Sequence, residues 1–342
     1  MKRGLTRRAL IAQLAGVAAW SAGAHGALGA EPPLVAFIHT QAAGDNGVVD
    51  GMIASVNRIG RDFPVTVRTI FANDPANYQP ILELLGEAKA AVVITTFQEM
   101  TQPLRAVAPE FPATRFLQLY GDPFVPSIPN VRTVAYETHP AGYLSGVCGA
   151  FLSKSGRLGY IGGTSIPLLN ANVNAMIAGA RSVNPTVDTR IAFVGSFQDP
   201  TKALDIANQM FGGAIDYVQA EAAASDQGTI DSANAHTGRI VIGGSRPAFA
   251  LGPQTVAAIT LCDFGTSLYQ QTSAALKADW RGGHYRSGLA DGVVDFTPSP
   301  IFLAHGPPAE VAKFRAAWPA ITEAKRRIAS GTISVPFKTA LG

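Results

Sequence analysis

The sequence lacks the motifs that mark the common catalytic sites. It contains no Gly-x-Ser-x-Gly nucleophile elbow, no His-Glu-x-x-His zinc motif and no phosphate-binding Walker loop, and its six histidines are scattered along the chain. No internal repeat or low-complexity tract is visible either. We therefore expect no catalytic residues, no metal and no cofactor, while an enzyme of another type stays open because one fold can carry many activities.

Charge is sparse and balanced. Charged residues make up 15% of the 342 residues, and the formal net charge is +3. Residues 1–30 hold four basic residues and no acidic one, so the rest of the chain carries 23 Lys and Arg against 24 Asp and Glu. Because a nucleic-acid-binding surface needs a large positive excess, we expect no nucleic-acid partner.

Residues 1–30 have the pattern of a targeting segment, a basic start followed by an Ala- and Leu-rich run and small residues. The apolar run is too short for a membrane-spanning helix. Thr6-Arg7-Arg8 resembles a twin-arginine export signal, but the general secretory route uses similar basic residues, so both routes stay open, as does cleavage after Ala24 or Ala30. No cysteine lies near either cleavage site, which predicts an exported periplasmic protein without a lipid anchor.

Cysteine is scarce as well. Cys148 falls on a predicted helix and Cys262 at the end of a late predicted strand, and the chain has no others. Two cysteines in an exported protein can pair, but two buried free thiols are the favoured interpretation.

Apolar runs rich in Val and Ile alternate with segments of helical period, and Gly, Pro or Asn marks each change. This pattern is typical of a parallel, doubly wound α/β sheet. The clearest unit is a strand (157–161), a helix (168–183) and a second strand (189–194). The 312 residues after the targeting segment are enough for two lobes with separate cores. Further strands are expected at 34–38, 65–71, 91–95, 116–120, 131–136, 217–220, 240–243 and 256–261, and further helices at 48–59, 75–86, 100–108, 140–154, 201–211, 226–235, 267–278 and 308–330.

Ligand sites in such sheets lie beyond the carboxyl ends of the strands. The side chains expected there suit a flat heteroaromatic ring, since aromatic faces can stack on it and carboxylates can accept hydrogen bonds from its edge. Gly163, in a tight turn after a strand, would let a ligand approach the backbone. The candidate binding residues at strand ends are Phe97, Phe197 and Phe264, the carboxylates Asp45, Asp199 and Asp263, and the polar residues Asn46 and Ser245.

Three phrases in this order and spacing resemble the BMP (basic membrane protein) family of substrate-binding proteins: SGVCGAFLSKSGRLGYIGG, GARSVNP and VGSFQDPTKA. The resemblance extends to TTFQEM and APEFPATRFLQLYG upstream and to GLADGVVDF and IASGTISVPF downstream, so it covers nearly the whole chain after residue 30. It implies a type I periplasmic-binding fold, that is, two Rossmann-like lobes joined by a hinge. It also implies an ABC importer that takes up purine nucleosides or related bases.

The resemblance gives roles to several candidate residues. Asp45 with Asn46 occupies the place of the family's ligand-gripping loop, Phe97 lies in a phrase that resembles its binding loop, and Phe197 stands where it places Trp or Phe against the ligand. Each residue also has a plain structural alternative. Asp45 would cap the following helix, Phe97 would cover a strand end, and Phe197 would cap a neighbouring helix.

The loop after the strand 240–243 departs from the family, which usually carries a carboxylate there. This chain has Ser245 and Arg246 instead, so an acceptor is replaced by a permanently cationic donor. If Arg246 faces the ligand, it favours an acceptor-rich or anionic compound such as an oxidised purine base. The alternative is that Arg246 lies in solvent or pairs with a surface carboxylate. Asp263 with Phe264 matches one of the family's patterns.

The expected organisation has a first lobe of residues 31–135 and 256–296 and a second lobe of residues 136–255 and 297–342. The resemblance implies capture of the ligand by hinge closure, followed by recognition by ABC permease and ATPase subunits at the inner membrane. We expect a monomer. A ligand-binding sensor that signals to a membrane partner is the alternative function.

Overall fold

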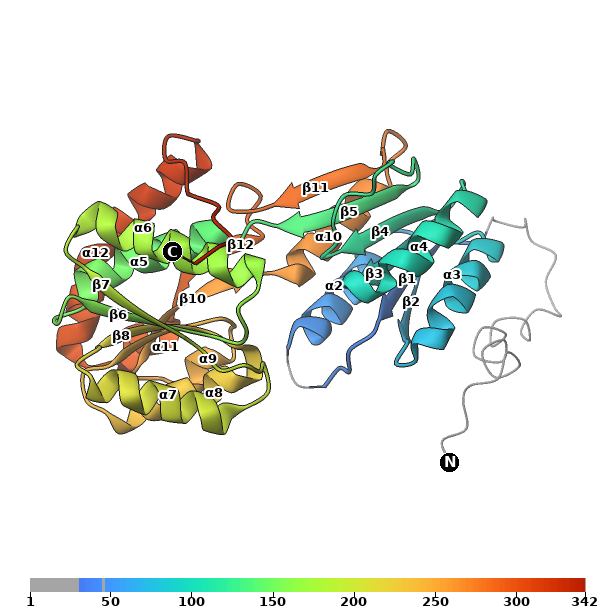
Figure 1. Ribbon diagram of the computed structural model, residues 1–342. Coiled ribbons are helices and arrows are strands. Elements are labelled where there is room, and N and C mark those ends of the chain that lie inside the picture. Colours follow the sequence, from blue (N-terminus) through green and yellow to red (C-terminus); the bar gives the residue numbers. More distant parts are fainter. Residues whose placement is uncertain (1–30, 45–46, 342) are drawn as a thin grey trace, which may run out of the picture. The chain divides into compact units, whose positions relative to one another are not determined.

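A computed structural model of the chain describes residues 31–44 and 47–341. The predicted targeting segment, residues 1–30, lies outside the described residues, as do Asp45 and Asn46. The described chain forms two six-stranded sheets surrounded by helices (Figure 1), which confirms the predicted α/β fold class. Among the helices of this described part, none combines the length and apolarity needed to cross a bilayer.

The first sheet is parallel throughout and has the strand order β11-β5-β4-β3-β1-β2. Strand β3 is buried along its whole length, and β1 is buried beyond its first residue. Continuous burial is typical of parallel strands that are covered on both faces. The strands are β1 (Leu34–His39), β2 (Thr66–Phe71), β3 (Val92–Thr96), β4 (Arg115–Leu119), β5 (Val131–Tyr136) and β11 (Gly283–Ser287).

The helices of the first lobe pack on this sheet through apolar stripes. In α2 the buried residues Val49, Met52, Val56 and Ile59 recur at intervals of three or four, which places them on one face of the helix. This face shares a core with Leu268 of α10 and with the strands. The helices are α2 (Val48–Asp62), α3 (Tyr78–Glu87), α4 (Thr101–Val107) and α10 (Phe264–Ala275), with short 3-10 turns η1 (Pro75–Asn77), η2 (Gln98–Met100) and η3 (Ala108–Glu110).

The second sheet has the order β12-β10-β9-β8-β6-β7, and only its edge strand β12 runs antiparallel to its neighbour β10. The expected strand–helix–strand unit is present as β6, α6 and β7. The strands are β6 (Arg157–Gly162), β7 (Asp188–Phe193), β8 (Tyr217–Glu221), β9 (Ile240–Gly243), β10 (Val256–Cys262) and β12 (Val294–Pro298).

Two cores flank the second sheet, one for each face. Helices α5, α6 and α12 share a core with Tyr160 and Tyr217, and α7, α8 and α9 share another with Ile161 and Val218. Packing of α12 on this lobe confirms the expected place of the last helix. The helices are α5 (His139–Leu152), α6 (Pro167–Val183), α7 (Pro200–Gly212), α8 (Asp226–Ala235), α9 (Ala248–Leu251), α11 (Pro300–His305) and α12 (Pro308–Ala329), with the 3-10 turn η4 (Ala223–Ser225).

Glycines in the quoted phrases let α5 and α6 pack at close range. A Cβ on Gly146 would lie 1.9 Å from the carbonyl oxygen of Met176, and one on Gly179 would lie 2.0 Å from that of Tyr143. Both approaches are far shorter than a real contact, so any side chain at either position would push the two helices apart. The glycines of this region therefore serve helix packing.

The chain passes between the two sheets three times: between β5 and α5, between β10 and α10, and between β11 and β12. The sequence predicted that residues 256–296 return to the first lobe, and the strand pairing corrects this. Strand β10 pairs with β9 and β12 in the second sheet, so only α10 and β11 of that segment lie with the first. The sequence of an apolar strand that is buried on both faces does not indicate which sheet the strand joins. This explains the error. With this change, the two-lobe division stays our proposal for the domains.

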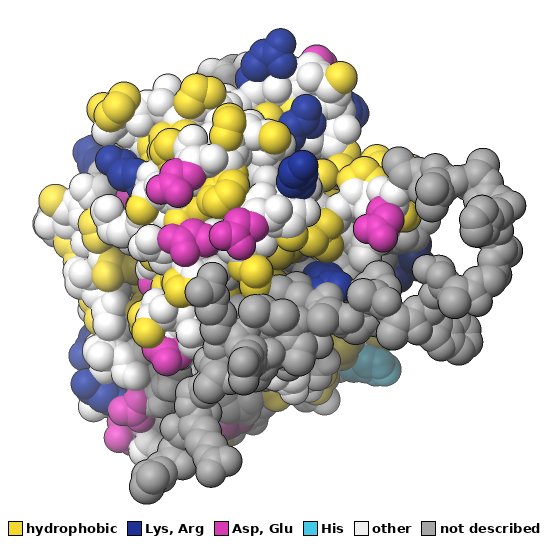
Figure 2. Space-filling view, turned by 90° about the vertical axis from the view of Figure 1, so that its right-hand side faces the viewer, with side chains coloured by type: hydrophobic (Ala, Val, Ile, Leu, Met, Phe, Trp, Pro, Cys, Tyr) yellow, Lys and Arg dark blue, Asp and Glu magenta, His cyan; other side chains and the backbone are white. Residues whose placement is uncertain are grey.

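Both cysteines are free, as predicted, but only Cys148 is also buried as the favoured interpretation expected. Cys148 is buried, and burial raises the pKa of its thiol to about 12. Cys262 is half-buried at the end of β10. Figure 2 shows the side of the molecule that lies on the right of Figure 1, where acidic and basic side chains are interspersed among hydrophobic and uncharged ones.

Candidate functional site

Most of the candidate residues stand where the sequence predicts, beyond the carboxyl ends of the strands. Phe97 follows β3, Phe197 follows β7, and Ser245 and Arg246 follow β9. Asp263 and Phe264 lie in the second passage, between β10 and α10. Asp45 and Asn46 fall outside the described residues, so their proposed role in ligand binding stays a prediction.

Four aromatic rings gather at the carboxyl edge of the first sheet. Phe97 and Phe264 each lie 6.0 Å, between ring centroids, from Tyr120, the residue directly after β4. Tyr136, at the end of β5, lies 4.6 Å from Phe264 and 6.1 Å from Tyr120. These separations are those of favourable aromatic pairs. Tyr136 is buried, so the three half-buried rings of Phe97, Tyr120 and Phe264 give the first lobe an aromatic surface suited to a flat ring.

Phe97 has a left-handed backbone, with φ at 58°. Such a conformation is uncommon for a bulky residue and persists only where its surroundings hold it. The Phe97 amide donates to the carbonyl of Leu119 at 2.9 Å. The side-chain amide of Gln118 donates to the Phe97 carbonyl at 2.9 Å and to the hydroxyl of Thr101 at 2.7 Å. The fold thus fixes a half-buried Phe97 just past the strand.

Phe197 places an aromatic ring beyond the carboxyl end of β7 in the second lobe. Its side chain is 36% exposed, and a Cβ on Gly163 would lie 2.3 Å from the ring, so the ring rests directly on that glycine. Ser225 holds the loop, because its amide donates to the Phe197 carbonyl at 3.3 Å and its hydroxyl accepts from the Asp199 amide at 2.8 Å. Gly163 therefore receives an aromatic ring rather than a ligand.

Two predicted carboxylates cap helices. Asp199 accepts a hydrogen bond from the Lys202 amide at 3.0 Å at the start of α7, and Asp263 accepts one from the Thr266 amide at 2.9 Å at the start of α10. Each satisfies one of the amides that a helix leaves without a partner at its N-terminus. A structural role thus accounts for one oxygen of each residue.

Arg246 lies beside another candidate residue. Its Nη2 is 3.7 Å from Oδ2 of Asp263, and the two side chains are 60% and 28% exposed. Of the two alternatives, pairing with a carboxylate fits this contact, although the partner is itself a candidate binding residue. Ser245 is exposed, and its carbonyl accepts from the Ala248 amide at 3.1 Å.

A carboxylate that sequence reasoning missed, Glu221, stands at the end of β8. Its oxygens accept hydrogen bonds from the Tyr160 hydroxyl at 2.5 Å, the Asn172 side-chain amide at 3.0 and 3.3 Å and the Thr260 hydroxyl at 3.2 Å. Asn172 in turn accepts from Thr138, in the first passage between the sheets, at 2.9 Å. Burial raises the pKa of Glu221. Through these bonds Glu221 links β8 to β6, α6 and β10.

Asp226, the first residue of α8, was also missed. It is 8% exposed, and burial raises the pKa of its carboxyl to about 8. Tyr120 and Tyr136 were missed too, although an aromatic residue at a strand end is the same signal that identified Phe97. The two carboxylates carried a weaker signal, because the segment between β8 and α8 is rich in alanine and resembles no binding motif.

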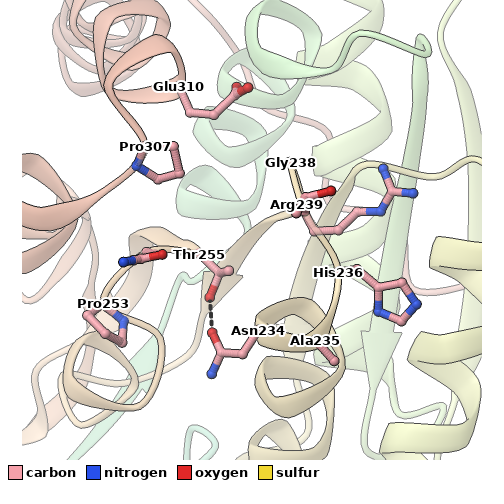
Figure 3. A pocket seen from close by; sticks show the side chains of 11 residues that line it. Asn234, Ala235, His236, Gly238, Arg239, Pro253, Thr255, Pro307 and Glu310 are labelled. Carbon is pink, nitrogen blue, oxygen red and sulfur yellow. Dashed lines mark hydrogen bonds between the residues drawn. The ribbon is translucent and has the colours of Figure 1, made fainter.

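A cavity of about 520 Å³ lies elsewhere in the second lobe (Figure 3). Residues 234–239 and 253–255 line it, together with Pro307 and Glu310. These segments precede β9 and β10, so the cavity lies at the amino ends of these strands and away from the candidate site. The Thr255 hydroxyl donates to Asn234 at 2.7 Å, and Glu310 is paired with Lys154. The cavity includes no predicted binding residue.

Comparison with known proteins places the chain among solute receptors. The family model described as ABC transporter substrate-binding protein PnrA-like (Bmp) matches residues 33–314. Basic membrane protein A of Borreliella burgdorferi is 25% identical over 285 residues, which cover 82% of this chain and 83% of that protein. A protein of Brucella abortus named a purine-binding protein is 25% identical over 225 residues, which cover 65% of this chain and 62% of that protein.

Solved structures share the fold. An ABC transporter solute-binding protein from Conexibacter woesei aligns with a TM-score of 0.71 and 22% identity, covering 90% of this chain and 99% of that one. One from Aeropyrum pernix aligns with a TM-score of 0.71 and 18% identity, covering 89% and 94%. A protein of Bacillus halodurans described as a transcriptional activator aligns with a TM-score of 0.72 and 16% identity, covering 88% and 99%. The predicted type I periplasmic-binding fold is confirmed.

Proposed function

We propose, because the chain belongs to the Bmp family of PnrA-like ABC transporter substrate-binding proteins, that it captures a purine base or nucleoside for an importer. The ligand would lie at the carboxyl ends of the strands, between the rings of the first lobe and Phe197 of the second. The observation that carries this proposal is the presence of exposed or half-buried aromatic rings at strand ends of both sheets. The purine-binding name of the Brucella relative supports the same cargo.

The chemistry of a purine matches these side chains. Its two faces are flat and apolar, so each can stack on an aromatic ring, and base–aromatic stacking is typically worth about 1 to 3 kcal/mol. Its edge carries N–H donors and carbonyl or ring-nitrogen acceptors, which Asp45, Asn46 and Ser245 can satisfy. Enclosure between two lobes removes the water that competes for these hydrogen bonds.

Trapping would follow from hinge closure. Three passages join the two sheets, and a ligand that touches both lobes favours the closed arrangement by its additional contacts. We further propose that residues 1–30 direct export to the periplasm and that the closed monomer is recognised by ABC permease and ATPase subunits. No step in this function requires catalysis. A sensor role would use the same pocket and the same closure with a different membrane partner. The Bacillus halodurans protein described as a transcriptional activator shares the fold.

The position of Arg246 narrows the class of purine that we propose as the ligand. If an acceptor-rich ligand displaces its exposed pairing with Asp263, the free guanidinium favours oxidised purine bases over nucleosides. We expect xanthine or urate to bind more tightly than adenosine or guanosine. Much tighter binding of the nucleosides would contradict this refinement and leave the purine assignment intact.

A thermal-shift screen of residues 31–342 tests the proposal. The panel comprises purine bases and nucleosides, amino acids and sugars. A ligand at 100 times its dissociation constant adds about 2.7 kcal/mol to the free energy of unfolding, so a true ligand gives a clear shift. We expect stabilisation by at least one purine. Stabilisation by sugars alone would contradict the proposed cargo.

A further inference from the structure

Asp226 carries a carboxyl oxygen that the chain leaves unsatisfied. Its Oδ1 accepts a hydrogen bond from the Ala222 amide at 2.6 Å. Its Oδ2 accepts none from any residue that the structure describes, although the residue is only 8% exposed. Unlike Oδ2 of Asp291, this oxygen is not among the fully buried side-chain atoms that lack a partner, so solvent can reach it and hydrogen-bond to it. Asp226 Oδ2 is therefore free to accept a hydrogen bond from a group outside the chain, either water or a ligand that displaces it.

This oxygen faces the carboxyl edge of the second sheet. A Cβ on Gly244, the residue directly after β9, would lie 3.4 Å from Asp226 Oδ2 and 3.6 Å from the Ala220 carbonyl oxygen. The absence of a side chain at Gly244 leaves that space to another group. Two oxygens border it, so a hydrogen-bond donor suits it best.

Asp226 is also joined to the loop of Phe197. The preceding residue, Ser225, donates its amide to the Phe197 carbonyl and its hydroxyl to the Ser196 carbonyl, at 3.3 and 3.2 Å. A ring stacked on Phe197 would therefore lie near the end of β8, where Asp226 begins the next helix. Glu221, by contrast, already accepts bonds from three side chains and has a structural role.

We propose that Asp226 is a ligand-binding residue whose Oδ2 accepts a hydrogen bond from a ring N–H or amino group of the bound heterocycle, beside Gly244. The inference rests on the proposed function and adds a requirement, namely that the edge of the purine that enters the second lobe carries an N–H donor. Xanthine, hypoxanthine and guanosine carry such donors. Caffeine has the same ring system with every N–H replaced by methyl, and we expect it not to bind.

The protonation of Asp226 provides a second readout. Burial raises its pKa to about 8, and the titratable groups that face it are Glu221 and Tyr160. An N–H donor favours the ionised carboxylate, so ligand binding near pH 7 should release a proton. Calorimetric titration of the unmodified protein in buffers of different ionisation enthalpy measures this release directly.

The main experiment compares Asp226→Asn with the matched control Asp231→Asn, which changes an exposed residue of the same helix. The asparagine has the same size, but its oxygen takes the Ala222 amide and its NH2 group then faces the donor of the ligand. We expect affinity to fall about tenfold to a hundredfold in Asp226→Asn and to stay unchanged in Asp231→Asn. The titrant is whichever of xanthine, urate, hypoxanthine, adenosine and guanosine binds the unmodified protein most tightly.

The outcomes separate the two proposals. If no purine base or nucleoside, urate included, binds the unmodified protein, the proposed function fails. If one binds and Asp226→Asn binds it equally well, only the role of Asp226 is wrong. Should the variant not fold, caffeine decides: failure of caffeine to bind the unmodified protein supports the contact, and binding of caffeine as tight as that of xanthine contradicts it.

Discussion

Phe197 rests on Gly163, and Ser225 fixes its loop, so its position does not depend on burial in the core. We expect Phe197→Ala to weaken ligand binding about tenfold or more, because it removes a stacking surface. The melting temperature of the ligand-free protein should change little. Calorimetry with the best purine, alongside thermal unfolding, measures both effects. The control is Phe151→Ala, which removes a similarly exposed ring (41%) from α5. Unchanged affinity in Phe197→Ala, or a large loss of stability, would place this ring outside the site.

Gly163→Ala tests the position of the same ring without removing it. The new methyl group would lie 2.3 Å from the ring, so Phe197 must move to make room. We expect a loss of affinity comparable to that of Phe197→Ala. Gly212→Ala is the control, since a methyl group there meets no atom of the described chain within 4 Å. Full affinity in Gly163→Ala would mean that the ligand does not require this position of the ring.

Asp226 should make the stability of the ligand-free protein depend on pH. Its folded-state pKa, about 8, lies above the ordinary value of about 4, so the unfolded chain ionises first as pH rises. The free energy of unfolding therefore falls between about pH 4 and pH 8. Asp226→Asn should lose this contribution, so its stability relative to the unmodified protein should rise between pH 5 and pH 8. Parallel melting temperatures for the two proteins across that range would contradict the raised pKa.

At the scale of single residues, strand-end position was the informative signal. It identified Phe97, Phe197 and Phe264 as neighbours of the predicted ligand site, and the structure places all three at carboxyl ends. It did not identify Asp226, because that residue lies in a helix and reaches the edge of the sheet only through tertiary packing against Gly244. The pairing of Arg246 with Asp263 was likewise hidden, since the two are brought together by neighbouring strands β9 and β10.

At the scale of elements, Asp199 links the loop of Phe197 to α7. It caps this helix, and removal of an N-cap carboxylate typically costs about 1 kcal/mol. We expect Asp199→Ala to lower the free energy of unfolding by about this amount and to affect ligand affinity less than Phe197→Ala does. The matched control is Asp205→Ala, an exposed position within the same helix. Equal stability of the two variants in urea unfolding would show that the cap contributes nothing.

Most helices and strands were predictable because their apolar residues follow a clear helical period or form continuous runs. The β6–α6–β7 unit was expected within a few residues of its bounds, since glycine and proline mark its ends. Strand β11 was not expected, because His284, Tyr285 and Arg286 give it neither an apolar run nor an alternating one. The sheet of β10 could not be predicted either, since pairing between distant strands is a property of the whole chain.

At the scale of the molecule, the proposed capture has the lobes close over the ligand. We expect the radius of gyration from small-angle X-ray scattering to decrease when the best purine is added to residues 31–342. Phe197→Ala at the same ligand concentration is the control. A variant that binds the ligand more weakly populates the closed form less. A radius that stays constant at saturating ligand would contradict hinge closure while leaving binding itself intact.

Calorimetric titration of a purine panel into residues 31–342 tests the central claim most directly. We predict that at least one base or nucleoside binds with one site per chain and micromolar or tighter affinity, while free ribose, arabinose and leucine give no binding heat. Binding of a sugar or an amino acid, with no heat from any purine, would contradict the assignment of this chain as a purine receptor.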